Sequence, residues 1–204
     1  MAQRTLLVHA CCGECLAGVL GPLASAGRFA VLFYNPNIQP LLEFRRRLKS
    51  VQVLADHEQL DLRFDARYDP KAFLRAVPWD RPERCEACYR LRLVETARVA
   101  AEGGFSAIAT TLMTSVHQDH EAVLRIGREA AAERGLEFLD EDWRPLAAHG
   151  HEEAKRRSLY RQQYCGCLFS EAERFGPTKV HLFRGGADSD LPAGGQRSRT
   201  GGDG

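Results

Sequence analysis

The stretch Leu6–Leu16, LLVHACCGECL, determines which fold this chain can form, because an apolar run passes directly into three closely spaced cysteines. Residues Thr5–His9 have the length and the apolar character of a buried strand. In open parallel sheets, ligands gather where strands end and helices begin. The thiols of Cys11, Cys12 and Cys15 are therefore predicted to lie at a functional site.

The rest of the chain alternates short β-type runs with longer amphipathic runs, which predicts an α/β fold with a mostly parallel sheet flanked by helices. Further strands are predicted at residues 30–35, 62–68, 106–112 and 136–139. Helices are predicted at residues 41–60, 86–102 and 120–134, and glycine follows the last two. We expect a single domain over residues 1–184, with a helical C-terminal part, and a disordered Gly/Ser-rich tail over residues 185–204.

The composition limits the possible classes of protein. The chain has 204 residues, of which 44% are hydrophobic, enough for the core of one domain. Its 28 Lys and Arg residues against 27 Asp and Glu residues leave a net charge of +1, so any nucleic-acid contact must come from local patches. No apolar run approaches the roughly 20 residues that span a bilayer. With no leader signature either, we expect a cytoplasmic protein without a membrane partner.

All seven cysteines fall into three groups, which are Cys11-Cys12-x-x-Cys15, Cys85-x-x-Cys88 and Cys165-Gly166-Cys167. Such grouping in a chain without a secretion signal indicates metal or redox chemistry, because the cytosol keeps ordinary thiols reduced. Four thiolates around a structural zinc ion are one interpretation. Thiolates around an iron–sulfur cluster, which tolerates irregular spacing, are the other. Spacing alone does not separate these two interpretations.

The third group, Cys165-Gly166-Cys167, has only a glycine between its two thiols. A disulfide between them would close a very small ring and would be strained, and strained disulfides are easily reduced and tend to be redox-active. The alternative is a pair of additional metal ligands. Glycine suits both interpretations, because it permits the unusual backbone that two close thiols require.

Taken together, the motifs resemble those of one family, the QueH-type epoxyqueuosine reductases. In chain order they are HACCGEC, FYNPNI, EFRRRL, YDP, RCEACYRLRL, TTL and LYRQQYCGC, covering residues from about Leu6 to Ser170. The resemblance implies a Rossmann-like (HUP-like) fold and an iron–sulfur enzyme without cobalamin. It also implies the last step of queuosine biosynthesis, reduction of epoxyqueuosine to queuosine at wobble position 34 of tRNAs with GUN-type anticodons.

The resemblance also implies roles for the cysteines. The implied ligands of a [4Fe–4S] cluster are Cys11, Cys12, Cys85 and Cys88. Cys15 stands where relatives have Cys or Asp, and is the candidate ligand of a second, mononuclear iron beside the cluster. Cys165 and Cys167 correspond to a redox-active pair. Converting an epoxide to an alkene consumes two electrons and two protons and releases water, so an electron donor, not identified by the sequence, is also required.

One segment departs from the family pattern. Where relatives often have a Ser-Pro-x-Lys-like stretch, this chain reads MTSVHQDHEAV over residues 113–123. His117, Asp119 and His120 are either replacements on the substrate side or the N-terminal cap of a helix, and we favour the cap.

Candidate proton donors are Asp69, Asp142 and Tyr164, chosen by location alone. Each has an ordinary alternative, which we favour. Asp69 before Pro70 suits a helix cap, Asp142 a surface carboxylate, and Tyr164 a packed aromatic ring.

The tRNA must be held by local basic patches. Arg156, Arg157 and Arg161 are the best candidates, because they lead into Tyr160, Tyr164 and the third cysteine group, combining charge for phosphates with rings for stacking. Two other patches are Arg45-Arg46-Arg47 with Lys49, and Arg90 with Arg92.

Two other classes of function remain open. One is a zinc-stabilised, non-catalytic RNA-binding module. The other is a nucleotide-using enzyme of the tRNA thiolation type, which we rank last because HACCGEC presents thiols where a phosphate-binding loop would present backbone amides.

Overall fold

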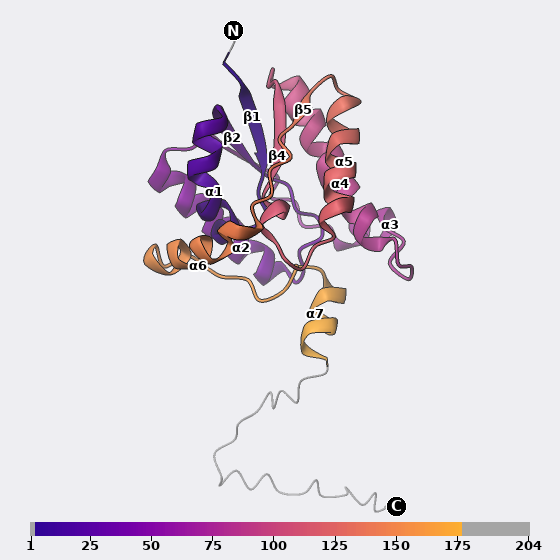
Figure 1. Ribbon diagram of the computed structural model, residues 1–204. Helices are drawn as coiled ribbons and strands as arrows, with labels where there is room; N and C mark the ends of the chain where they lie inside the picture. Colours follow the sequence, from indigo (N-terminus) through magenta and orange to yellow (C-terminus); the bar gives the residue numbers. More distant parts are fainter. Residues whose placement is uncertain (1–2, 177–204) are drawn as a thin grey trace, which may run out of the picture.

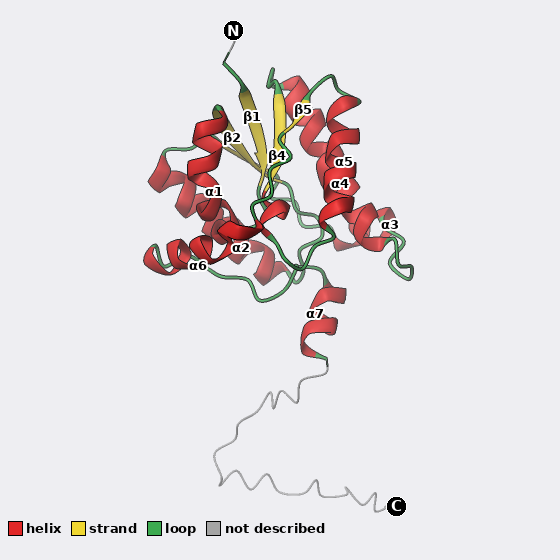
Figure 2. Cartoon of the chain, viewed as in Figure 1, coloured by secondary structure: helices red, strands yellow, loops and turns green. Residues whose placement is uncertain are grey.

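Five parallel strands form one sheet in the computed structural model, which describes residues 3–176 (Figure 1, Figure 2). The strands are β1 (Thr5–His9), β2 (Arg28–Phe33), β3 (Leu62–Phe64), β4 (Ala107–Thr110) and β5 (Glu137–Phe138). Their order across the sheet is β3-β2-β1-β4-β5, and every neighbouring pair is parallel. The predicted α/β architecture with a parallel sheet is therefore confirmed. The predicted tail, residues 185–204, and the end of the predicted domain lie outside the described residues.

Helices cover both faces of this sheet. They are α1 (Gly13–Ala26), α2 (Leu41–Glu58), α3 (Pro70–Ala76), α4 (Arg84–Glu102), α5 (His120–Ala132), α6 (Ala147–Arg156) and α7 (Leu168–Phe175), with 3₁₀ turns η1 (Thr111–Thr114) and η2 (Arg144–Leu146). Helices α1 and α2 lie on one side of the sheet and α4 and α5 on the other, while α7 projects below the sheet in this view (Figure 1). Over residues 3–176, no helix has both the length and the apolar character needed to cross a membrane.

The core follows the apolar runs of the sequence. The side chains of Leu6, Leu7 and Val8 in β1 are completely buried, and β4 is buried along its whole length. Burying one leucine side chain contributes about 1.5–3 kcal/mol, so the central strands are a strongly stabilised part of the fold. The stripe predicted over residues 41–60 forms α2, with Phe44 and Val51 buried against the sheet.

The strands are shorter than, or shifted from, the predicted runs for local reasons. β3 ends at Phe64 instead of continuing to residue 68, because the Asp65 carboxylate accepts a hydrogen bond from the Arg67 N–H at 2.9 Å and turns the chain away. β4 ends at Thr110 instead of residue 112, because the Thr110 hydroxyl oxygen accepts from the Leu112 N–H at 3.2 Å and begins η1.

The C-terminal part is helical, as predicted, but its two cysteines are not within a helix. Cys165 and Gly166 lie in the loop between α6 and α7, and Cys167 is the N-cap of α7. The cysteine sulfur accepts a hydrogen bond from the Ser170 N–H at 3.4 Å. The third cysteine group therefore depends on contacts with other segments for its position.

Candidate metal centre

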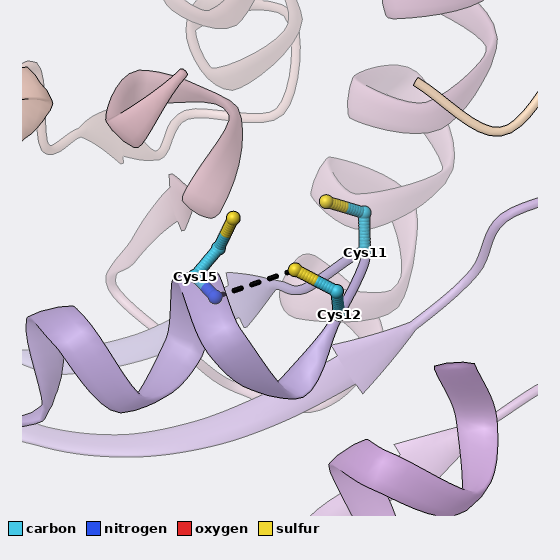
Figure 3. Close-up of side chains that lie close together, drawn as sticks. All are labelled: Cys11, Cys12 and Cys15. Carbon is cyan, nitrogen blue, oxygen red and sulfur yellow. Dashed lines mark hydrogen bonds between the residues drawn. The ribbon is translucent and has the colours of Figure 1, made fainter. Parts of the chain in front are cut away.

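The first cysteine group lies at the carboxyl end of β1, in the centre of the sheet (Figure 3). Cys12 is the N-cap of α1, and its sulfur accepts from the Cys15 N–H at 3.3 Å, which brings both side chains to the same turn. The sulfur atoms of Cys11, Cys12 and Cys15 all lie within 4.8 Å of one another. In residues 3–176 this is the one cluster of potential metal ligands that the structure brings together.

Glycine is needed directly after this pair of cysteines. A Cβ atom on Gly13 would lie 2.4 Å from Ser50 Oγ and 3.0 Å from the Ser50 carbonyl oxygen in α2. Helix α1 can therefore begin directly behind Cys12 only because residue 13 has no side chain.

The three thiols share their protons unequally. Hydrogen bonds from Cys12 and Cys15 hold the pKa of Cys11 well below its usual range. Burial raises the pKa of Cys12, and the interaction with Cys11 raises the pKa of Cys15 to about 12. The negative charge of the group therefore collects on Cys11.

A buried histidine supports this end of the sheet. His9 Nδ1 lies 2.9 Å from Thr110 Oγ1, and His9 Nε2 lies 3.2 Å from Asn35 Oδ1. Burial lowers the His9 pKa to about 4, so the imidazole is neutral at physiological pH. Asn35 Nδ2 also donates to the Ala10 carbonyl at 2.9 Å, which fixes the backbone just before Cys11.

The second and third cysteine groups line one small cavity of about 30 Å³. Its four cysteines are Cys85 and Cys88 of α4, and Cys165 and Cys167 of the loop before α7. Cys88 is buried, which raises its pKa to about 12, whereas Cys85 is exposed. All seven cysteines lie among the described residues, and each is a free thiol.

The third group is held by side chains of α2. Arg47 is completely buried and donates from Nη1 to the Cys165 carbonyl and from Nη2 to the Tyr164 carbonyl, both at 2.9 Å. Its Nε donates to Glu43 Oε1 at 2.7 Å. Arg47 belongs to a basic patch that the sequence offers for tRNA binding, and the burial of its guanidinium excludes that role.

Gly166 adopts a backbone conformation that disfavours other residues. Its φ angle is +125°, and a Cβ atom there would lie 3.0 Å from Ile38 Cγ1 and 3.2 Å from Arg47 Nη1. The carbonyl of Gly166 also accepts from the Gln39 N–H at 2.8 Å. A glycine between the two thiols thus lets the loop pack directly against the start of α2.

A larger cavity of about 640 Å³ connects the first and third groups. Cys11, Cys15 and Cys165 line it, together with polar side chains that include Glu14, Gln118 and Gln162. Cys165 borders both cavities, and its thiol interacts electrostatically with Cys11 and with Cys167. Cys165 therefore borders the space beside the first group and the space beside the second.

The three candidate proton donors have the structural roles that the sequence analysis favoured over catalysis. Asp69 caps α3, accepting from the Ala72 N–H at 2.9 Å, and Asp142 pairs with Arg144 at 2.7 Å, which lowers its pKa. The Tyr164 hydroxyl donates to the Gln39 carbonyl at 2.7 Å.

Residues 113–123, which depart from the family pattern, supply a helix cap, the interpretation that the sequence favoured. Some of them also line the larger cavity. Asp119 accepts from the Ala122 N–H at 3.0 Å as the N-cap of α5, which begins at His120. His117 lines the larger cavity, so this segment also borders the space next to Cys11 and Cys15.

The candidate tRNA-binding arginines differ in exposure. The Arg156 side chain is 64% exposed and pairs with Glu153, and Arg161 is 41% exposed and pairs with Glu14. Arg157 is only 15% exposed and pairs with both Glu58 and Glu153. In the patch formed by Arg90 and Arg92, Arg92 is buried and therefore cannot contact a phosphate. The burial of Arg47 and Arg92 was not predicted from the sequence. A signal existed for Arg92, since it lies four residues after Cys88 and therefore on the same helical face.

Comparisons with known proteins agree with the motifs. The family model for "Epoxyqueuosine reductase QueH" matches residues 6–173. A protein of that name from Dehalococcoides mccartyi is 34% identical over 172 residues, which cover 84% of this chain and 94% of that protein. One from Thermotoga maritima is 32% identical over 179 residues, covering 83% and 92%. One from Haemophilus influenzae is 30% identical over 179 residues, covering 82% and 72%.

Proposed function

Because the chain belongs to the epoxyqueuosine reductase QueH family, it is an enzyme that converts epoxyqueuosine to queuosine in tRNA, and we propose how its cysteines support that reaction. Removing the epoxide oxygen takes two electrons and two protons and leaves an alkene and water. No ordinary side chain other than a thiol gives up electrons readily, so the clustered thiols are the observation that carries the proposal.

We propose that Cys11, Cys12, Cys85 and Cys88 hold a [4Fe–4S] cluster, and that Cys15 binds a second iron. The sulfurs of Cys11, Cys12 and Cys15 lie within 4.8 Å of one another, so all three can face one metal centre. Cysteine thiolates are the ordinary ligands of iron–sulfur clusters. When bound, these groups would supply low-potential electrons and a Lewis acid for the epoxide oxygen.

The larger cavity is the proposed binding site for the modified base. Its volume of about 640 Å³ lies within the range of small-molecule sites, about 300–1,000 Å³. An enzyme that acts on a base inside a folded RNA must take that base out of its stack. Gln118 and Gln162 line the cavity together with Cys11 and Cys15, and their amide groups can form hydrogen bonds with the base.

Cys165 and Cys167 are proposed to pass electrons toward the site. Joining two thiols into a disulfide releases two electrons and two protons, the number that one epoxide consumes. An external donor then returns two electrons and restores both thiols. The position of Cys165 on the walls of both cavities supports this role.

The tRNA is proposed to lie over α6 and the loop after it. Arg156 and Arg161 are exposed there, close in the chain to Tyr160 and to the third cysteine group. Arg157 is also a candidate, although a phosphate would have to compete with its two carboxylate partners. We further propose that the tRNA carries a GUN-type anticodon modified at position 34, that the enzyme is cytoplasmic, and that cobalamin takes no part.

The strand order β3-β2-β1-β4-β5 supports the finer assignment of the fold as Rossmann-like (HUP-like). Doubly wound sheets of this kind bind ligands where the strand order reverses, beside the first strand. The first cysteine group follows β1 at that point.

The test uses anaerobically purified protein, dithionite and tRNA that contains epoxyqueuosine, with nucleosides measured by mass spectrometry. We expect iron and sulfide in cluster proportions and conversion of epoxyqueuosine to queuosine. Cys167→Ser should keep the cluster absorbance but lose turnover with the physiological donor, whereas Cys85→Ser should lose the absorbance. Zinc without sulfide in active protein would overturn the proposed cofactor.

A further inference from the structure

The two buried arginines beside the cysteines, Arg47 and Arg92, differ in how many hydrogen bonds and ion pairs their guanidinium groups form. Arg47 has a carboxylate partner and two backbone carbonyls, as described above. Arg92, on α4, is 1% exposed and donates from Nε to the Cys88 carbonyl at 3.1 Å, and its guanidinium lies 5.6 Å from the centre of the Tyr89 ring. Its Nη2 is buried and has no hydrogen-bond partner.

An unpaired guanidinium in the interior is costly. Charged groups are almost never fully buried unless they are paired, since an uncompensated buried charge loses its hydration. Among the described residues, no carboxylate forms an ion pair with Arg92. We therefore expect the hydrogen bond from Nη2 to be accepted by a group that the chain itself does not provide.

The surroundings of Arg92 identify the chemistry of that group. Arg92 lines the small cavity with Cys85, Cys88, Cys165 and Cys167. Its charge also lies close enough to interact with Cys88, Cys165 and Cys11, which come from all three cysteine groups. The positive charge therefore lies among sulfur atoms that become anionic when they bind metal.

We propose that Arg92 donates a hydrogen bond from Nη2 to a sulfur of the iron–sulfur centre, and that its fixed positive charge raises the reduction potential of that centre. This inference rests on the proposed cofactor. Reducing a cluster adds negative charge, so a buried cation nearby stabilises the reduced form more than the oxidised form. Hydrogen bonds to cluster sulfurs act on the potential in the same way.

The test compares Arg92→Met, which removes the charge, with Arg92→Lys, which keeps it. Arg90→Met is the matched control, because Arg90 lies two residues away on the same helix and its side chain is 44% exposed and paired with Glu129. The midpoint potential of each protein is measured by redox titration followed by electron paramagnetic resonance. We expect a more negative potential for Arg92→Met, a smaller shift for Arg92→Lys and no shift for Arg90→Met.

Failure of this inference is distinguishable from failure of the proposed cofactor. A wild-type protein without iron and sulfide would refute the cofactor, and the inference with it. A normally loaded Arg92→Met protein with the wild-type potential would refute the role of Arg92 and leave the proposed cofactor standing. Equal shifts in Arg92→Met and Arg92→Lys would refute the effect of its charge.

A second measurement needs no charge-removing variant to fold. In protein labelled with ¹⁵N-arginine, electron spin echo modulation of the reduced cluster should show coupling to a guanidinium nitrogen. That coupling should disappear in Arg92→Lys and persist in labelled Arg90→Met. Its absence from the wild-type protein would overturn the proposed hydrogen bond.

Discussion

The first and third cysteine groups are built in opposite ways. Cys11 and Cys12 follow the central, fully buried strand β1, and backbone hydrogen bonds of the sheet and α1 hold them in place. Cys165 lies in a loop that side chains of α2, above all Arg47, hold from outside. A cofactor needs ligands that stay fixed, and the sheet provides this for the first group, whereas the position of the third group depends on a few side chains of α2.

The contrast predicts, first, that losing a cluster ligand affects the enzyme more than any other change. Cys88 is buried in α4, and Cys88→Ser replaces a proposed cluster ligand with a hydroxyl, which is a much weaker ligand for iron than a thiolate. We expect loss of most of the bound iron and at least a 100-fold lower rate of queuosine formation. Iron analysis and single-turnover assays check this. Cys167→Ser serves as the control that keeps its iron, and a Cys88→Ser protein with full iron content would contradict the ligand assignment.

The second prediction concerns the support of the third group. Arg47→Met leaves the buried Glu43 carboxylate and two backbone carbonyls without their donor. Breaking a buried ion pair by removing one partner costs about 3–5 kcal/mol. Urea unfolding of the metal-free protein should show a loss of this size. Arg46→Met is the matched control, since Arg46 is exposed and adjacent, and it should change stability by less than about 1 kcal/mol. Equal losses in both variants would contradict the role of Arg47.

A third, smaller effect is expected from the glycine of the loop. Gly166→Ala forces a side chain into a conformation with φ of +125° and against Ile38 and Arg47, which should cost about 1–3 kcal/mol. Gly21→Ala is the control, because a Cβ atom on Gly21 in α1 meets nothing beyond its chain neighbours and the backbone of its own helix. Alanine there should change stability by less than about 1 kcal/mol, since the gain in helix propensity is offset by crowding against Pro22. Thermal unfolding of both variants measures the difference. A Gly166→Ala protein as stable as the wild type would show that the loop adapts freely.

The smallest effect is expected at the proposed tRNA-binding surface. Arg156→Gln removes one exposed charge and should weaken tRNA binding severalfold, with a salt dependence lower by about 0.7–0.9 in slope. Arg98→Gln on α4, whose side chain is bound to Glu95 and Glu102, should leave both unchanged. Binding measured by fluorescence anisotropy at several salt concentrations checks this. Identical slopes for Arg156→Gln and the wild type would remove Arg156 from the surface.

The sequence predicted the first group well, because its signals are local. An apolar run such as Leu6–Val8 followed by glycine identifies a strand that passes into a helix, and the structure has both. The stripe that contains Phe44 and Val51 likewise identified α2. Where strands ended early, the cause was a hydrogen bond from a backbone N–H to the side chain of Asp65 or Thr110, which periodicity does not record.

The support of the third group was not predictable, because it depends on contacts between distant residues. Arg47 and Glu43 are a visible i,i+4 pair, but such a pair is usually exposed to solvent. Its burial arises from the Tyr164 and Cys165 carbonyls, more than a hundred residues away. The meeting of Cys165 with Cys88 around one cavity has the same origin, since a loop path leaves no periodic pattern in the sequence.

Anomalous diffraction at the iron edge from anaerobically grown crystals would show where iron binds. We expect four iron peaks bonded to the sulfurs of Cys11, Cys12, Cys85 and Cys88, so that the first and second groups share one cluster, and a fifth iron peak beside Cys15. Iron confined to Cys11, Cys12 and Cys15, with Cys85 and Cys88 free of metal, would contradict this arrangement.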